Sequence, residues 1–307
     1  MTAYIARRVF QAVFVIIGVT LLAFFIMFLT GDPTYLLLGD VRGMTQVEIE
    51  AFRHEMGFDR PVAIQYWDYM KNAIRGDLGK SYYHRVPNME LILERMPATL
   101  QLALTGQALA ILIAVPLGVY AAVHRNTIAD HLTMVGALLG QSVPVFWLGL
   151  LMILLFSVEL RWFPVSGYGT LRHLVLPAIT LGAFSMARIA RLTRSTLLEV
   201  LSEDYINTAR AKGLSERVVI YKHALRNAMI PVVTIIGLSM GMLLGGAVIT
   251  ESIFAWPGVG RMILTAIQTK DLPLVQSSVI VLSSGFVGIN LLVDIMYGFL
   301  DPRIRYD

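Results

Sequence analysis

The sequence predicts an all-α protein that crosses a membrane six times. Of its 307 residues, 56% are hydrophobic and only 15% are charged, a balance that a soluble domain of this length rarely carries. The apolar residues gather in long runs, and a helix needs about 20 of them to cross ~30 Å of hydrocarbon. The runs long enough to do so are 9–30, 99–123, 132–157, 173–191, 231–250 and 274–300, of which the fourth is the weakest.

The first run is interpreted as an uncleaved first span. Arg7 and Arg8 precede it, as they would in a signal peptide. The run is longer than the apolar region of such a peptide, however, and no small-x-small cleavage pattern follows it. We therefore expect it to stay in the membrane with the five other spans.

Basic residues predict the orientation of the chain. If the N-terminus lies inside, the inner segments and the inner end of the fourth span carry 13 Lys and Arg residues, whereas the two short outer loops carry four. Positive charge concentrates on the cytoplasmic side of membrane proteins, so both termini are expected there. The net charge of +4 is patchy and gives no basic stripe of the kind that binds nucleic acid.

The long loop 31–98 is expected to be a folded extracytoplasmic element. Its apolar residues are Val62, Ile64, Trp67, Tyr69 and Ile74. A helix is expected over 68–72, before Gly76. Composition leaves two interpretations open, namely a cap over the outer mouth of the bundle and a docking surface for an extracytoplasmic protein.

Polar residues within the spans are candidates for a transport pathway. Pro116 and Pro144 should kink the second and third spans, and Gln107 and Gln141 lie in the same spans. Buried amides seek partners on other helices or a wet cavity, so both a pathway and ordinary packing stay open. Asp294 lies near the inner end of the sixth span, where either a functional carboxylate or an ion pair with Arg303 or Arg305 is expected.

One catalytic pattern occurs in the fifth span. Residues 237–241 match G-x-S-x-G with Ser239 at its centre, which a hydrolase would place at a strand-to-helix turn with a histidine as base. All six histidines fall in loops or at span ends, so an intramembrane serine hydrolase is a remote alternative. Gly237, Gly241 and Gly245 predict instead a ridge of small residues against which another helix packs closely.

The sequence lacks several residues and motifs on which catalysis, nucleotide binding or metal binding commonly depends. It contains no cysteine, no G-x-x-x-x-G-K-[ST] nucleotide loop and no H-E-x-x-H metal motif. A secondary transporter would need no ATPase, but such proteins carry inverted internal repeats, and no clear repeat is present.

The polar stretch 192–230 is the most informative loop. Ser202 is expected to cap a helix that has Glu203 and Asp204 in its first turn, and Gly213 is expected to end it. Ser215 should start a second helix, and Pro231 suits the first turn of the fifth span. A short capped helix on the inner face could fit into a cleft of a cytoplasmic partner and transmit its motion; the alternative is a solvated loop whose charges set the topology.

This stretch resembles the coupling loop of ABC-importer permeases, in the branch that transports peptides, nickel and glutathione. Residues 204–214, DYINTARAKGL, carry the resemblance, with Asn207-Thr208-Ala209 in place of the Glu-Ala-Ala of other branches. Other matching motifs are Gly31-Asp32-Pro33, Gly76-Asp77-Leu78-Gly79, Phe254-Ala255-Trp256-Pro257-Gly258 and Asp301-Pro302-Arg303-Ile304-Arg305. They cover nearly the whole chain.

The resemblance implies a multi-pass protein of the bacterial inner membrane with the ABC type I importer fold. Residues 1–98 would hold the first helix and the outer loop, and 99–307 a five-helix permease core with the cytoplasmic coupling loop 192–230. The chain would form half of a pathway for di- or oligopeptides, or alternatively for glutathione or chelated nickel. It would not itself be an enzyme.

The resemblance also implies partners: a second homologous permease, two ABC ATPases and an extracytoplasmic substrate-binding protein. ATP and Mg would be bound by the ATPases, and no cofactor by this chain. The residues expected to form the ATPase-coupling helix are Glu203, Asp204, Tyr205, Ile206, Asn207, Thr208, Ala209, Arg210, Ala211, Lys212 and Gly213. An arginine at Ala209 is expected to uncouple the transporter.

Overall fold

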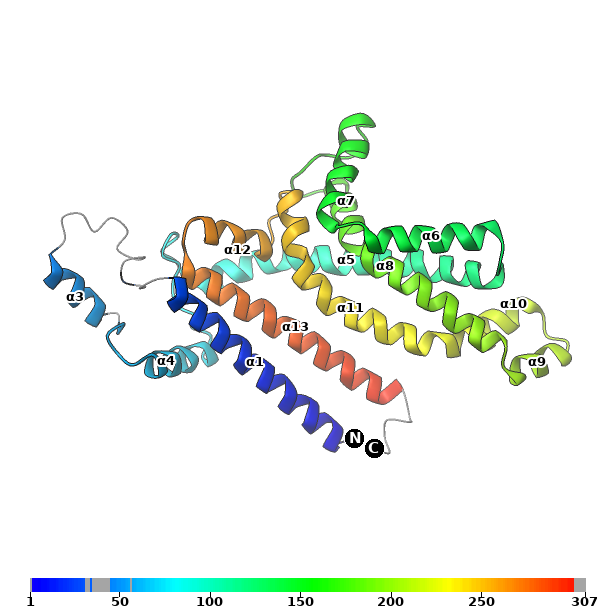
Figure 1. Cartoon of the computed structure of the whole chain (residues 1–307), viewed down its shortest axis with the longest axis horizontal. Helices are drawn as coiled ribbons and strands as arrows, with labels where there is room; N and C mark the ends of the chain where they lie inside the picture. The colour runs from blue at the N-terminus through cyan, green and yellow to red at the C-terminus, as the bar shows by residue number, and fades with distance from the viewer. Residues whose placement is uncertain (1, 31–33, 35–44, 56, 301–307) are drawn as a thin grey trace.

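The computed structural model describes residues 2–30, 34, 45–55 and 57–300, and most of these residues lie in helices (Figure 1). The membrane-sized helices are α1 (Thr2–Thr30), α5 (Asn88–Val123), α8 (Leu171–Leu201), α11 (Leu225–Ile253) and α13 (Leu272–Leu300). The shorter helices are α3 (Gln46–Glu55), α4 (Val62–Ile74), α6 (Ile128–Ser142), α7 (Val145–Met152), α9 (Asp204–Ala211), α10 (Glu216–Val218) and α12 (Val259–Gln268). Two π-helical segments, η1 (Ile153–Glu159) and η2 (Val219–Ala224), continue α7 and lead into α11.

Five of the six predicted spans are present as single helices, and several of these are longer than their apolar runs. These five described helices are long and apolar enough to cross a membrane, and the predicted third span corresponds to a bent pair that makes a sixth if the pair counts as one span. The second span starts at Asn88 rather than 99, so the expected division at 98/99 falls inside α5. The fourth continues to Leu201, about two turns beyond the arginines that appeared to end it.

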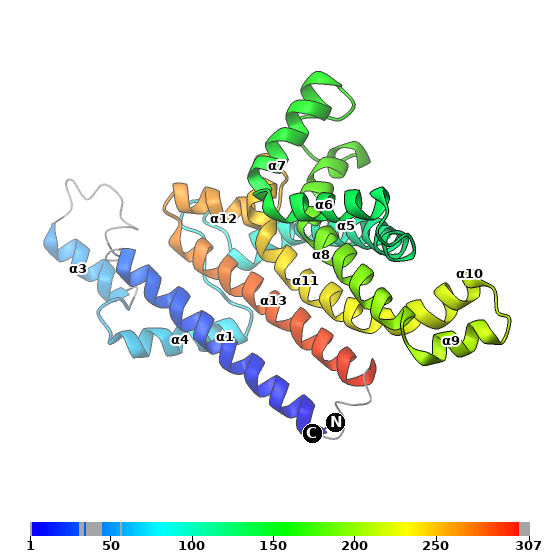
Figure 2. The same cartoon turned by 45° about the vertical axis from the view of Figure 1, so that its right-hand side comes forward.

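The third span is broken rather than kinked. Helix α6 ends at Ser142, and α7 leaves it at 109°, with Pro144 as the residue before the first turn of α7. The prolyl ring fixes φ and removes a backbone donor, so the chain cannot continue the line of α6. The result is an arm formed by α7 and η1 that projects from the bundle (Figure 2).

The core of the bundle is the crossing of α5 with α8, and α11 packs against both. Small residues allow this close approach. A Cβ atom at Gly182 would lie 2.5 Å from the carbonyl oxygen of Gly106, and one at Gly118 would lie 2.6 Å from that of Ala190. Larger side chains at these positions would push the two helices apart.

The glycine ridge of α11 packs against α13, and α1 in turn packs on the other side of α13. A Cβ at Gly237 would collide with Val293, and one at Gly241 would meet Asn290 and Phe286. The ridge is confirmed for these two glycines. The third member was predicted wrongly, because nothing lies within 4 Å of a Cβ at Gly245.

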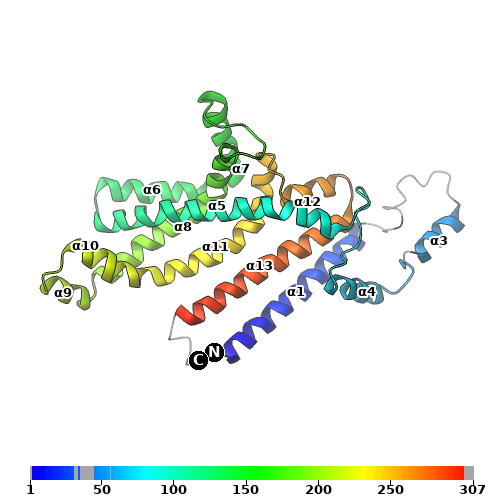
Figure 3. The ribbon, with the colours of Figure 1, turned by 180° about the vertical axis from the view of Figure 1, so that it is seen from behind.

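The two ends of the bundle carry different elements. The start of α1 and the end of α13 lie toward the same end as α9 and α10, whereas α3, α4 and α12 lie at the opposite end (Figures 1 and 3). The first end is the one to which the basic residues assign the cytoplasm. The predicted helix in the outer loop is confirmed as part of α4, which ends before Gly76 at φ +85°.

Candidate functional site: an inner coupling loop and an outer turn

Helix α9 is held against the inner end of the bundle by one apolar face. Ile206 is fully buried and Ala209 is 7% exposed. They join an apolar cluster with residues of α5, α8, η2 and α11, namely Val119, Ala122, Leu197, Val219, Ala224 and Ala228. Movement of α9 must therefore move the ends of these helices with it.

The opposite face of α9 is free of contacts with the bundle. Asp204, Thr208 and Ala211 follow one another at helical spacing and are exposed. Two polar contacts brace the flanks of the helix: Asn227 Nδ2 donates to Tyr205 Oη at 2.8 Å, and Arg210 Nε lies 2.8 Å from Glu216 Oε1. An orderly, anchored helix with an exposed outer face is what a docking element requires.

The ends of α9 agree in part with the sequence. Gly213 follows the last turn at φ +77°, as predicted. Ser202 was wrongly predicted as the cap, because Glu203 is the residue before the first turn and the Ser202 hydroxyl donates to Glu199 O of α8. Pro231 lies inside α11 rather than in its first turn, because the helix begins earlier.

A buried ion pair fixes the inner loop that precedes α6. Arg194 of α8 donates to both carboxylate oxygens of Asp130, at 2.5 and 2.7 Å, and the Asp130 side chain is 1% exposed. Asn126 N donates to the same carboxylate at 3.0 Å. Sequence reasoning missed this pair, although Asp130 is the only acidic residue in the short inner loop and Arg194 was counted only as a topological charge.

The candidate pathway residues lie in different environments. Gln107 is 5% exposed; it accepts from Ser185 Oγ at 3.0 Å and donates to Ile236 O at 3.4 Å, so it joins α5, α8 and α11. Gln141 is half-buried, one residue before the end of α6. Ser239 is buried in the middle of α11, and within the described part of the chain its hydroxyl has no hydrogen-bond partner.

Asp294 forms an ion pair between the first and last spans. Its Oδ2 lies 3.3 Å from Arg8 Nη1 of α1. The pair was expected, but with Arg303 or Arg305, which lie outside the described residues together with the rest of the motif 301–305. The motif at 31–33 lies outside them as well.

At the outer end, the motif 254–258 forms a buried turn between α11 and α12. Trp256 is 1% exposed, and its indole N–H donates to Ala98 O at 2.8 Å. Glu251, which sequence reasoning missed, is fully buried and accepts from Thr99 Oγ1 at 2.7 Å and from Arg261 N at 2.9 Å. Its carboxylate thereby caps α12 from another helix.

The motif 76–79 forms a second outer turn, which is attached to α13 because Ser277 Oγ donates to Leu78 O at 2.9 Å. Asp271, 1% exposed, accepts from Ser81 Oγ and from Tyr82 N at 3.1 Å. Burial raises the pKa of the neighbouring Tyr82 phenol to about 12, and the Asp271 carboxylate adds to this shift. Tyr82 therefore stays neutral at physiological pH.

No group of three or more His, Asp or Glu side chains that could hold a metal ion occurs among residues 2–30, 34, 45–55 and 57–300. Ser239 lies on a continuous helix instead of a strand-to-helix turn, so the geometry expected of a G-x-S-x-G nucleophile is lacking.

Comparison with known proteins places this arrangement in a family. Residues 114–306 match the binding-protein-dependent transport system inner membrane component family, and residues 1–103 match the N-terminal family of the same transport-system membrane components. Because the first match covers more than half of the chain, the protein belongs to this family of ABC-importer permeases. It is a multi-pass protein of the bacterial inner membrane, and a permease of this kind works with ATPase and substrate-binding partners.

Relatives match along the full length. The chain is 43% identical over 335 residues to the di/tripeptide transport system permease protein DppB of Pseudomonas aeruginosa, covering 100% of this chain and 99% of that one. It is also 43% identical over 307 residues to the glutathione transport system permease protein GsiC of Escherichia coli K12, covering both chains completely.

A solved structure supports the fold. The MetNI methionine ABC transporter, in inward-facing conformations, has a chain that matches with a TM-score of 0.58 at 19% identity, covering 69% of this chain and 97% of that one. At this identity the likeness concerns the fold alone, which is that of an ABC type I importer permease.

Proposed function

We propose that this chain forms half of the translocation pathway of an ATP-driven importer and that α9 is the element through which the ATPases drive it. A second homologous permease would supply the other half, and two ATPases would bind the two coupling helices. ATP and Mg would be bound by the ATPases and no cofactor by this chain, which would have no enzymatic activity of its own.

The observation that carries this proposal is the division of α9 into two faces. Ile206 and Ala209 anchor the helix to the ends of three spans, and Asp204, Thr208 and Ala211 face away from them. Force applied to the outer face would reach the ends of α8 and α11 through this apolar cluster and through η2. The other expected members of the coupling helix, from Glu203 to Gly213, complete the same exposed surface or its ends.

Because α9 has one buried and one exposed face, a substitution that tests docking should be made on the exposed face. Ala209 is buried, so an arginine there would overpack the anchor and damage the loop itself. Ala211→Arg places the same side chain on the exposed face. We expect the Ala211→Arg complex to lose binding-protein-stimulated ATP hydrolysis and uptake while the permease keeps its level in the membrane and its melting temperature.

Two controls make the result specific. Ala211→Ser should behave as the parent, because it adds one exposed hydroxyl. Ala209→Arg should lower the melting temperature of the permease as well as its activity. Full stimulated ATP hydrolysis with Ala211→Arg would show that α9 does not dock on the ATPase.

The solute is proposed from the relatives. DppB and GsiC are named for di/tripeptides and glutathione, which share an α-amino group, a carboxylate and amide bonds. We propose a small peptide as the solute, with glutathione as the alternative and chelated nickel as a third. A strain lacking the chain should lose uptake of one of labelled dipeptide, glutathione and nickel, and regain it with the gene. Retention of all three would contradict the proposal.

The candidate pathway residues differ in their suitability. Gln141, half-buried next to the break in the third span, and Asp294, whose side chain is 26% exposed, are the two that a solute could approach. Gln107 and Ser239 are enclosed between helices, where they would contribute to packing.

A further inference from the structure

Helix α4 of the outer loop has three faces of different chemistry. Residues 66, 69 and 73 follow at spacings of three and four, as do 65, 68 and 72, and as do 64, 67, 71 and 74. At 100° per residue each set shares one side of the helix. The first side is aromatic and small (Tyr66, Tyr69, Ala73), the second is polar (Gln65, Asp68, Asn72), and the third is largely apolar (Ile64, Trp67, Lys71, Ile74).

The aromatic side attaches α4 to the bundle. Tyr66 Oη lies 2.9 Å from Thr20 Oγ1 of α1, and the rings of Tyr66 and Phe24 are 5.4 Å apart. Tyr69 and Ala73 pack against the outer apolar cluster, which also contains Val275 and Val279 of α13.

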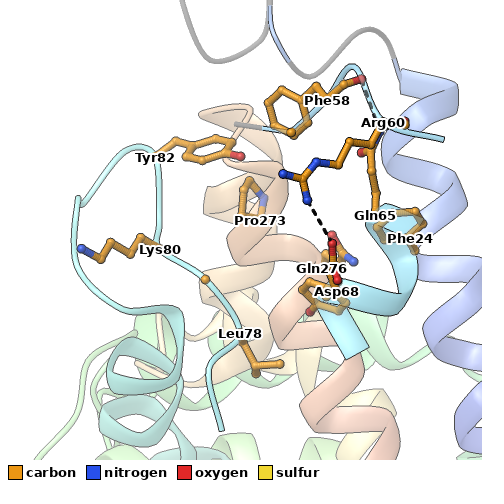
Figure 4. A pocket seen from close by; sticks show the side chains of 13 residues that line it. Phe24, Phe58, Arg60, Gln65, Asp68, Leu78, Lys80, Tyr82, Pro273 and Gln276 are labelled. Carbon is orange, nitrogen blue, oxygen red and sulfur yellow. Dashed lines mark hydrogen bonds and ion pairs between the residues drawn. The ribbon is translucent and has the colours of Figure 1, made fainter. Parts of the chain in front are cut away.

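The polar side borders an open cavity of about 410 Å³. Gln65 and Asp68 line it, with Arg60, Lys80 and Gln276 on other walls (Figure 4). Arg60 Nη1 lies 3.5 Å from Asp68 Oδ2 across this space. The cavity is open, and its charged and amide side chains can hydrogen-bond water, so we take this side of α4 to face water.

The third side is apolar, and its large side chains are exposed in the part of the chain that the structure describes. Ile64 is 47% exposed, Trp67 61% and Ile74 81%. None of the 13 residues of α4, all of them described, is buried. Lys71 does not break the apolar character, because its ammonium lies 5.8 Å from the centroid of the Trp67 ring and its stem can follow the apolar surface.

The depth of α4 identifies what covers this side. The apolar run of α1 extends to Thr30, where the helix ends, and the contacts of α4 are with Phe24 and Thr20, about 9 and 15 Å below that end at 1.5 Å per residue. On α13, Val279 lies seven residues after Leu272, about 10 Å below the outer end. Helix α4 is therefore located beside the outer halves of two spans, at the depth of the outer leaflet and next to its headgroups.

We propose that α4 is an interfacial helix whose side formed by Ile64, Trp67 and Ile74 lies in the outer leaflet of the bilayer. Trp and Lys are the residues that concentrate at this level, and the polar side then faces the water outside. Neither a cap over the pathway nor a docking surface is needed to account for this apolar side. The proposal concerns the outer loop and does not depend on the identity of the solute.

The absence of cysteine from the chain makes a direct test practical. Single cysteines at Ile64, Trp67 and Ile74, with Asn72→Cys as the control on the polar side of the same helix, would be spin-labelled in the complete transporter. The complex would be reconstituted in vesicles of phosphatidylethanolamine and phosphatidylglycerol, and collision rates of each label with oxygen and with a water-soluble nickel chelate would be measured.

We expect the oxygen-to-nickel ratio to be severalfold higher at 64, 67 and 74 than at 72, because oxygen concentrates in lipid and the chelate in water. Equal, nickel-dominated ratios at all four positions would overturn the proposal. So would protection of 64, 67 and 74 that arises only when the binding protein is added, since that would identify a protein docking surface. Each variant is retained only if its stimulated ATP hydrolysis matches that of the parent.

Discussion

At the scale of single residues, the pair of Asp130 and Arg194 joins the first turn of α6 to the inner half of α8. The carboxylate is buried and accepts from the guanidinium through two bonds and from the backbone of the turn through a third. A bidentate pair of this kind is specific in geometry, and removing one partner leaves the other charge without compensation. The pair therefore holds α6, and with it the projecting arm, in a fixed position relative to α8.

Asp130→Asn should destabilise the permease by about 2 kcal/mol. A neutral amide weakens two charge-assisted hydrogen bonds, and the partly buried guanidinium of Arg194 loses its counter-charge. Thermal unfolding of the purified complex in lipid discs would measure the loss. Exchanging the two residues, Asp130→Arg with Arg194→Asp, should recover part of it.

Glu94→Gln is a matched control, because this carboxylate is exposed and should change stability by less than about 0.5 kcal/mol. If Asp130→Asn melted at the same temperature as Glu94→Gln, the pair would not hold the loop.

At the scale of elements, the crossing of α5 and α8 sets the geometry of the core. The backbones of Gly106 and Gly182 are in contact, so a side chain on either must separate the helices. Gly182→Val should cost at least about 1–3 kcal/mol through overpacking and lower the yield of folded complex in gel filtration.

Gly136→Val adds the same branched side chain to α6, where nothing lies within 4 Å of a Cβ atom. It carries the same cost in helix propensity but no collision, so its complex should elute as the parent. Equal losses for both variants would mean that helix propensity, and not the crossing, explains the effect.

At the scale of the whole molecule, the order of the spans and the excess of Lys and Arg in the inner segments predict one orientation of the chain in the membrane. Alkaline phosphatase fused after Gly169, between the arm and α8, should be active outside, whereas the same enzyme fused after Asn126 should be inactive. A green fluorescent protein should give the opposite pattern. Activity of both phosphatase fusions would contradict the orientation inferred from Lys and Arg.

The spans could be predicted from the sequence because their signal is local. An apolar run of 20 residues identifies a membrane helix whatever its neighbours. The ends were less accurate, because polar residues such as those of 88–98 and 192–201 extend a helix beyond the membrane without any apolar signal. Pro144 was recognised as a perturbing residue, but a proline alone does not say whether a helix bends or breaks.

Contacts between distant residues could not be predicted in this way. Asp130 and Arg194 are 64 residues apart, and Thr99 and Glu251 are 152 apart. Each looks like an isolated polar group until the helices are assembled. For α9 the sequence identified the helix and its glycine end, but the assignment of Ala209 to the inside required the position of the neighbouring spans.

The helix that starts at Glu216 continues through η2 and α11 to Ile253, a total of 38 residues, or about 57 Å at 1.5 Å per residue. One end adjoins the coupling helix and the other carries Glu251, which holds the outer turn. Because the helix turns by about 100° per residue, the number of residues between its two ends fixes how one end is rotated relative to the other. A single inserted residue would turn one end against the other by about 100°, so the length of this helix is tied to the alignment of the two faces of the membrane.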